Sequence, residues 1–208
     1  MNSLTPLGIF IFFVGLLSLF LKKNTKAQKS VEQSFWERER RSNLTRRQDI
    51  SGLPYITIPL DKFPIGICAD DDLKEYEAKL TALSQQKLLN LGTQTNTDLK
   101  LKYGIANLNS LSDCEQRFTI LCRTLVSYAA RLIQLGYSAE AKTVLEFGID
   151  CGSDLSRNYL MLADLYLEQA NYPAFNELTQ KASMLDSPMK KTILKHLAEK
   201  TDDTPDAS

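Results

Sequence analysis

The first 21 residues carry no charged side chain, which restricts what the start of this chain can form. Residues 4–21 are almost wholly apolar, and as a helix they would reach roughly 27 Å, close to the thickness of a bilayer's hydrocarbon core. Pro6 falls where the start of a helix tolerates proline, because the missing N–H would have no partner there. We therefore expect residues 1–21 to be a transmembrane anchor.

The direction of the anchor follows from the charges around it. A cleaved signal peptide needs positive charge before the apolar run and a small-residue cleavage site after it. Residues 1–7 contain no Lys or Arg, and the run leads directly into Lys22 and Lys23. Positive charge marks the cytoplasmic side of a membrane segment. We expect a single-pass protein of the cell membrane whose C-terminal part, residues 22–208, is cytoplasmic.

Basic residues concentrate just after the anchor. Residues 22–47 hold nine Lys or Arg against three Glu. Because the whole chain holds 25 basic and 25 acidic residues, residues 48–208 retain 16 basic and 22 acidic ones, so the two parts have net charges of +6 and −6. The total is neutral and no nucleic-acid-binding motif is present, so we expect no nucleic-acid partner.

Residues 22–48 are expected to form a basic juxtamembrane helix, because residues 30–48 contain strong helix formers and no Gly or Pro. Two interpretations stay open. The helix is either solvated or held flat on the anionic cytoplasmic leaflet, where each nearby Lys or Arg contributes about 1 kcal/mol and aromatic rings sit at headgroup level. In the second case the candidate lipid-headgroup contacts are Phe35, Trp36, Arg38, Arg40, Arg41, Arg46 and Arg47.

Residues 49–70 change character abruptly. Pro54, Pro59 and Pro64 each disfavour helix at the preceding residue, and residues 55–58 are β-branched and aromatic, which favours an extended chain. One strand alone is not stable, so we expect an extended linker or strap packed along the helical domain. The alternative is a docking peptide for a partner's groove or sheet edge. The expected apolar anchors of the strap are Leu53, Ile56, Ile58, Leu60 and Phe63.

Beyond the strap the apolar residues recur at helical spacing. Asp70, Asp71 and Asp72 precede the first helix, where they can cap it; they lack the glycine and the closing glutamate of a calcium-binding loop. We expect a helical domain over residues 71–200 and a disordered, acidic tail over residues 201–208. The predicted helices cover residues 73–91, 97–108, 113–135 and, as a final capping helix, 189–200, with a break at 109–112.

Part of this domain repeats itself at a shift of 34 residues. Small residues fall at corresponding places, where they let the helices of each hairpin approach closely, and larger ones fill the space between neighbours. The aligned pairs are Leu125 with Tyr159, Tyr128 with Leu162, Ala129 with Ala163, Leu132 with Tyr166, Gly136 with Ala170, Ala141 with Phe175 and Gly148 with Ala182.

With this period and pattern, residues 122–188 resemble a tetratricopeptide-repeat (TPR-like) protein. The pattern departs from the family at Asp154, where a closing proline is expected, and at Phe175, where the second helix usually has alanine. The resemblance implies an all-α array of helix hairpins that binds a peptide or helix of a partner protein in a concave groove. On that analogy the candidate partner-binding residues are Tyr128, Arg131, Asn158, Tyr159 and Asp164.

A looser resemblance covers other parts of the chain. The apolar start, the basic stretch at residues 35–41 and the segment at residues 49–60, followed by helical repeats, look like small single-pass membrane proteins of Gram-positive bacteria. This likeness implies no site residues.

The sequence offers little for catalysis. His196 is the single histidine, so no His-based triad or histidine metal site can form, and no phosphate loop, GxSxG or HExxH motif occurs. The four cysteines contain no CxxC pair, which favours free thiols over metal ligation. We expect no catalytic residue, no metal and no cofactor.

The expected function is a membrane-anchored scaffold or adaptor that binds a protein or peptide at the cytoplasmic face of the membrane. The alternative is a membrane-surface organiser that acts through the basic helix and self-association, without a dedicated peptide groove. The sequence sets no oligomeric state.

Overall fold

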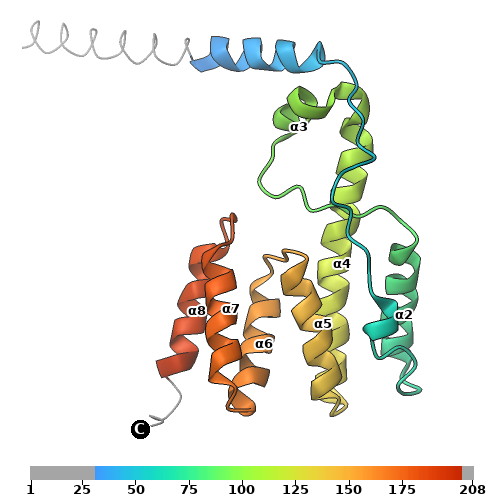
Figure 1. The fold of residues 1–208 in the computed structure, drawn as a ribbon, viewed down its shortest axis with the longest axis vertical. Helices are drawn as coiled ribbons and strands as arrows, with labels where there is room; N and C mark the ends of the chain where they lie inside the picture. The colour runs from blue at the N-terminus through green and yellow to red at the C-terminus, as the bar shows by residue number, and fades with distance from the viewer. Residues whose placement is uncertain (1–30, 203–208) are drawn as a thin grey trace, which may run out of the picture. The chain divides into compact units, whose positions relative to one another are not determined.

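The computed structural model describes residues 31–202, and all regular elements in that range are helices (Figure 1). The expected all-α fold is confirmed; extended pairing within residues 31–202 is limited to an isolated bridge between Ile56 and Leu88. The predicted transmembrane anchor at residues 1–21 lies outside the described residues. Among residues 31–202 no helix has the length and apolar character needed to cross a membrane.

The chain divides into two compact units. Of the described residues, 31–49 and 95–108 form the first, called here the small unit; residues 50–94 and 109–202 form the second, called the hairpin unit. Each unit is described by itself.

The small unit pairs the basic segment with a short helix. Residues 31–43 are helical, and α3 (Asn96–Tyr103) begins with a capping box in which Thr95 and Asp98 exchange hydrogen bonds. The side chain of Glu39 accepts a hydrogen bond from Thr97 Oγ1 at 2.9 Å and forms an ion pair with Lys100. The 3-10 helix η2 (Ile105–Asn107) follows α3.

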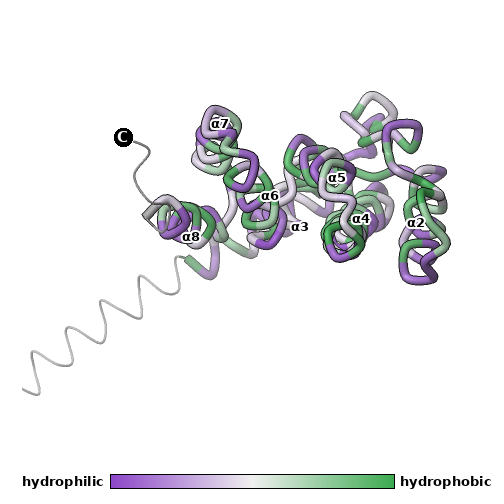
Figure 2. The backbone as a smooth tube through the Cα atoms, turned by 90° about the horizontal axis from the view of Figure 1, so that it is seen from below, coloured by the Kyte–Doolittle hydropathy of each residue, from purple (hydrophilic) through white to green (hydrophobic). Residues whose placement is uncertain are grey.

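The hairpin unit arranges its main helices in two rows. Figure 2 shows these helices end on. In that view α5 and α7 lie in one row, α4, α6 and α8 lie in the other, and α2 lies beside α4. One hydrophobic core runs through the unit. The helices of the hairpin unit are η1 (Leu60–Lys62), α2 (Asp71–Ser84), α4 (Leu108–Gln134, whose first residue belongs to the small unit), α5 (Ser138–Asp150), α6 (Ser156–Glu168), α7 (Tyr172–Ser183) and α8 (Lys190–Asp202).

The two hairpins, α4–α5 and α6–α7, turn in the same way. At the first turn Tyr137 N donates to Leu132 O at 2.9 Å, and 34 positions further Asn171 N donates to Tyr166 O at 2.8 Å. The residue before each donor has a left-handed backbone, with φ +86° at Gly136 and φ +50° at Ala170. This bond together with a left-handed residue is the Schellman ending of a helix. The structure is thus made of packed helix hairpins whose turns recur at the shift found in the sequence.

Small residues lie where the helices meet, as the sequence predicts. Ala129, Ala163 and Ala182 are fully buried. At Gly148 of α5, a Cβ would lie only 2.8 Å from Oδ1 of Asn158 on α6. The amide Nδ2 of Asn158 in turn donates to Leu145 O at 3.0 Å, so the two helices are held at close range.

The segment before α2 lies against the helices through apolar side chains. Ile58 and Phe63 are buried, and Ile56 N donates to Leu88 O at 2.9 Å. The ring of Phe63 meets that of Phe147 on α5 edge to face, with centroids 5.5 Å apart. Residues 50–70 of the hairpin unit therefore contribute to its core.

Several predicted helix boundaries are wrong. The basic juxtamembrane helix, predicted to reach residue 48, ends at residue 43. The helix predicted over residues 97–108 ends at Tyr103, because Gly104 takes a φ of +84°. The helix predicted over residues 73–91 ends at Ser84, because the chain beyond it turns back to pair with Ile56 and buries Leu88. The break predicted at residues 109–112 is helical instead, since α4 already starts at Leu108. Burial of Leu111 in this first part of α4 outweighs the weak helix propensity of its Asn and Ser neighbours.

Exchanging glycine and alanine at the two matching turns should change the free energy of unfolding in opposite directions. We expect Gly136→Ala to lower the free energy of unfolding by about 1 kcal/mol, because a Cβ is unfavourable at positive φ although nothing lies within 4 Å of it. We expect Ala170→Gly to raise it by about 0.5 to 1 kcal/mol, since the same strain is relieved. Urea unfolding of the full chain measures both; equal signs for the two variants would contradict the shared turn.

Candidate partner-binding site

Tyr128, the first of the predicted groove residues, lies inside the hairpin unit. Its side chain is fully buried, and its hydroxyl can donate to Glu77 Oε1 at 3.2 Å or to Pro64 O at 3.1 Å. Gly66 N donates to the same Glu77 oxygen at 3.0 Å. Burial, together with the nearby Glu77 carboxyl group, raises the pKa of Tyr128. Tyr128 thus joins α4 to α2 and to the segment before it.

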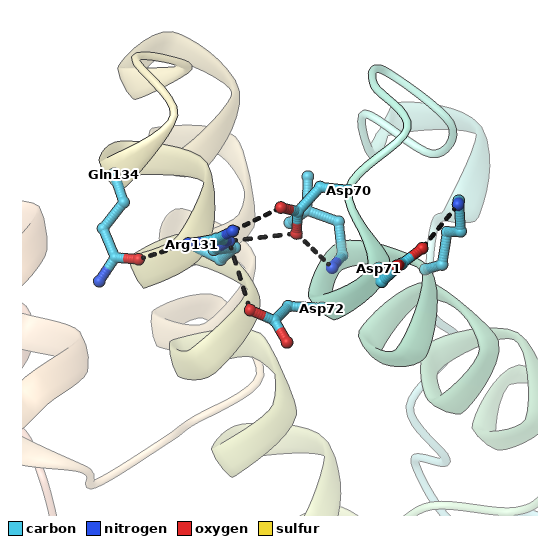
Figure 3. A network of polar contacts seen from close by, with 7 residues as sticks. Asp70, Asp71, Asp72, Arg131 and Gln134 are labelled. Carbon is cyan, nitrogen blue, oxygen red and sulfur yellow. Dashed lines mark hydrogen bonds and ion pairs between the residues drawn. The ribbon is translucent and has the colours of Figure 1, made fainter.

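Arg131 is held by the start of α2 (Figure 3). Its Nε donates to Asp70 Oδ1 at 3.1 Å, its Nη2 pairs with Asp70 Oδ2, and Asp72 Oδ2 lies 3.5 Å from Nε. Asp70 also caps α2 by accepting a hydrogen bond from Leu73 N at 3.0 Å, which confirms the predicted capping role. The hydrogen bonds from Arg131 and from Leu73 N lower the pKa of Asp70 to about 2.

The remaining three predicted groove residues contact other elements. Asn158 is fully buried against α5, and Tyr159 is 1% exposed. Asp164 is exposed on α6 and forms an ion pair with Lys200 of α8. The structure therefore does not gather the five residues on one open surface, and Tyr128 and Asn158 are out of a partner's reach in this conformation.

The predicted lipid contacts lie in the small unit and are largely exposed. Phe35 is 54% and Trp36 58% exposed, and their rings meet edge to face with centroids 5.4 Å apart. Arg38 pairs with Asp98, and Arg47 Nε donates to Asn107 Oδ1 at 3.3 Å. Arg40, Arg41 and Arg46 are exposed. Their contact with lipid stays a prediction.

A cavity that sequence reasoning missed lies in the hairpin unit, where α4 extends past the end of α5. Its volume is about 880 Å³, within the roughly 300 to 1,000 Å³ of typical ligand pockets. Its walls come from the middle of α4, the turn between α5 and α6, the segment after α7 and the loop after α2. The lining residues are Asn90, Gly92, Thr93, Glu115, Phe118, Thr119, Ile149, Asp150, Gly152, Asp154, Tyr159, Lys181, Met184, Leu185, Asp186, Ser187 and Pro188.

Hydrogen bonds hold these walls together across long sequence separations. The loop after α2 is tied to the turn between α5 and α6, because Asn90 Nδ2 donates to Gly152 O at 3.0 Å. It is tied to the segment after α7 by Thr93 Oγ1, which donates to Asp186 Oδ2 at 3.1 Å. The ends of the two hairpins and a loop from outside the repeat therefore border the same cavity.

Tyr159 forms part of the cavity wall, and its hydroxyl makes no hydrogen bond within residues 31–202. The Tyr159 side chain is almost wholly buried. Burial, with the nearby Asp154 as a smaller cause, raises the pKa of Tyr159 to about 12. At neutral pH the hydroxyl is therefore protonated and can donate to a bound group or accept from it.

The cysteines do not form a site within residues 31–202. Cys114 and Cys122 are buried, Cys68 and Cys151 are partly exposed, and all four are free thiols. In the described part of the chain no group of three or more His, Cys, Asp or Glu side chains is arranged to hold a metal ion.

Comparisons of the chain with protein-family models, with curated proteins and with solved structures find no match. The TPR-like resemblance therefore depends on the 34-residue period and on the matching turns.

The buried hydroxyl of Tyr128 is expected to stabilise the hairpin unit. Tyr128→Phe removes its hydrogen bonds to Glu77 and Pro64, and we expect the free energy of unfolding to fall by about 1 to 3 kcal/mol. The matched control is Tyr172→Phe, because Tyr172 is 42% exposed and its loss of a hydroxyl should change stability by less than about 0.5 kcal/mol. Urea unfolding distinguishes the two; equal effects would argue against a buried network.

The ion pair of Asp70 should make stability depend on pH. Since its pKa falls from 3.8 to about 2 on folding, the stabilisation is complete above about pH 4 and is lost as the pH drops toward 2. Asp70→Asn keeps the cap on Leu73 N but removes the charge, so the variant should be less stable than wild type at pH 7 and equal to it near pH 2.

Unfolding midpoints measured across this pH range test the Asp70 prediction. In an Arg131→Gln background the difference between Asp and Asn at position 70 should shrink at pH 7, because Arg131 is the main cause of the lowered pKa. A difference that persists unchanged at pH 2 would contradict the ion-pair explanation.

Proposed function

We propose that this chain is a membrane-anchored, TPR-like scaffold that binds a segment of a partner protein at the cytoplasmic face, and that it is not an enzyme. The observation that carries the proposal is the cavity of about 880 Å³ at the shared end of the two hairpins. Phe118, Ile149 and Leu185 give it apolar lining, and Tyr159 supplies a hydroxyl that makes no hydrogen bond inside the described chain. A concave site that combines apolar surface with polar groups is typical of binding sites.

The hairpin repeat supports the TPR-like class. Two hairpins recur at 34 residues with the same turn hydrogen bonds, and their helices form two rows (Figure 2). About three repeats are needed for an independently stable stack. In the hairpin unit α2 and α8 flank the two hairpins and take the place of terminal repeats.

The membrane location is supported by the sequence alone. Residues 4–21 are apolar and uncharged, and the basic residues that follow favour a cytoplasmic C-terminal part. A scaffold in this position would hold its partner close to the membrane.

Site-specific photo-crosslinking in intact cells tests the proposal. Thr119 is exposed and lines the cavity, whereas Thr192 is also exposed but lies on α8 and does not line the cavity. A photoreactive side chain at position 119 should capture a defined protein band, and the same group at position 192 should not. Equal capture at both positions, or none at position 119, would count against a partner in the cavity.

A second candidate function is favoured by the exposed aromatic pair of the small unit. Phe35 and Trp36 are more than half exposed beside exposed arginines, which suits the headgroup region of an anionic leaflet. The chain would then organise the membrane surface without a dedicated groove. The same crosslinking experiment separates the two: a photoreactive group at position 36 that captures lipid, with no capture at position 119, would favour this alternative.

A further inference from the structure

The cavity of the hairpin unit has a strong excess of negative charge. Four carboxyl side chains line it, those of Glu115, Asp150, Asp154 and Asp186, against the single cation of Lys181. Lys181 is already engaged, since its Nζ lies 2.8 Å from Asp150 Oδ1 and 3.5 Å from Glu177 Oε1. The other three carboxyl groups have no ion-pair partner within residues 31–202.

Two of these carboxyl groups are fixed in position by neutral donors. Asp186 accepts from Thr93 Oγ1 at 3.1 Å, and Asp154 accepts from Ser187 Oγ at 2.6 Å, in each case through Oδ2. A hydroxyl orients a carboxylate without cancelling its charge, and Oδ1 of both residues makes no hydrogen bond inside the described chain. The carboxylates are therefore oriented before any cation arrives.

Glu115 adds a third carboxyl group, on the α4 side. Burial raises its pKa, as expected for an acid that has no cation beside it. Phe118, Ile149 and Leu185 add apolar lining, and Tyr159, whose hydroxyl makes no hydrogen bond within the described residues, lines the same space. The hollow thus combines fixed negative charge, apolar surface and one spare hydrogen-bonding group.

The size and shape of the lining exclude the simplest cationic ligand. A metal ion needs several oxygens at about 2 to 2.6 Å from one point, and no such group of side chains exists in the described part of the chain. A hollow of about 880 Å³ instead has room for several side chains. A small polycation would leave the apolar lining of Phe118, Ile149 and Leu185 uncontacted, whereas a protein segment can place apolar side chains against it.

We propose that the cavity binds a cationic segment of a partner protein, in which Arg or Lys side chains meet Glu115, Asp154 and Asp186 while an apolar side chain enters beside Tyr159. This inference rests on the proposed function and names the chemistry of the partner. Complementary charge of this kind sets specificity and the rate of association more than the total affinity.

Binding of defined peptides to the purified full chain in mild detergent tests the inference. The probe is a short fluorescein-labelled peptide of alternating arginine and leucine, followed by fluorescence anisotropy. Two matched peptides replace arginine with glutamate, or leucine with serine, and spermine serves as a competitor that has charge but no apolar side chains. The arginine–leucine peptide should bind most tightly, and its affinity should fall as salt is raised.

Substitutions in the cavity provide the decisive comparison. Glu115→Gln and Asp154→Asn remove charge but keep the side-chain size, and Asn at position 154 can still accept from Ser187. Each should weaken binding of the arginine–leucine peptide about two- to fivefold. Glu168→Gln is the matched control, because Glu168 is exposed on α6 and does not line the cavity; it should leave the affinity unchanged.

The outcomes separate this inference from the proposed function. Unchanged affinity in both cavity variants, equal binding of the glutamate peptide, or spermine competing as well as the unlabelled arginine–leucine peptide would each overturn it. Capture from position 119 in cells should also weaken when Glu115→Gln and Asp154→Asn are combined. If that capture persists at full strength, the cationic partner is wrong while the binding function stands.

Discussion

Close approach between neighbouring helices is the constraint on which the hairpin unit depends. Gly148 leaves no room for a Cβ against Asn158, and the alanines at the other helix contacts are fully buried. At this spacing Asn158 reaches the carbonyl oxygen of Leu145 and ties α5 to α6. Larger residues there would separate the helices, and both the core and the mouth of the cavity would lose their walls.

Residues outside the repeat complete what two hairpins lack. The side chain of Glu77 on α2 is largely buried and accepts hydrogen bonds from Gly66 N and from the hydroxyl of Tyr128. Phe63 adds an aromatic contact with Phe147. The hairpin unit thus gains polar and apolar contacts from chain outside the two repeated hairpins.

The sequence predicts the helical class, the hairpin turns and the cap at Asp70, because these depend on periodicity and on residues close together in the chain. It misplaces the end of α2, since the bridge of Ile56 with Leu88 is a tertiary contact that no local pattern shows. The five predicted groove residues depend on the analogy with the TPR-like family, and that analogy does not include the burial of Tyr128 against α2. The cavity escaped prediction because its carboxyl groups come from segments far apart in the chain; the acidic excess of residues 48–208 was its only signal.

The hydrogen-bond partners of the loop after α2 lie much later in the sequence. Thr93 finds its partner Asp186 only 93 positions later, and Asn90 finds Gly152 62 positions later. During synthesis, when the N-terminal part emerges first, the helices can form early, but the mouth of the cavity closes only after the segment beyond α7 has left the ribosome. A chain that ends before residue 184 would therefore lack one wall of the cavity.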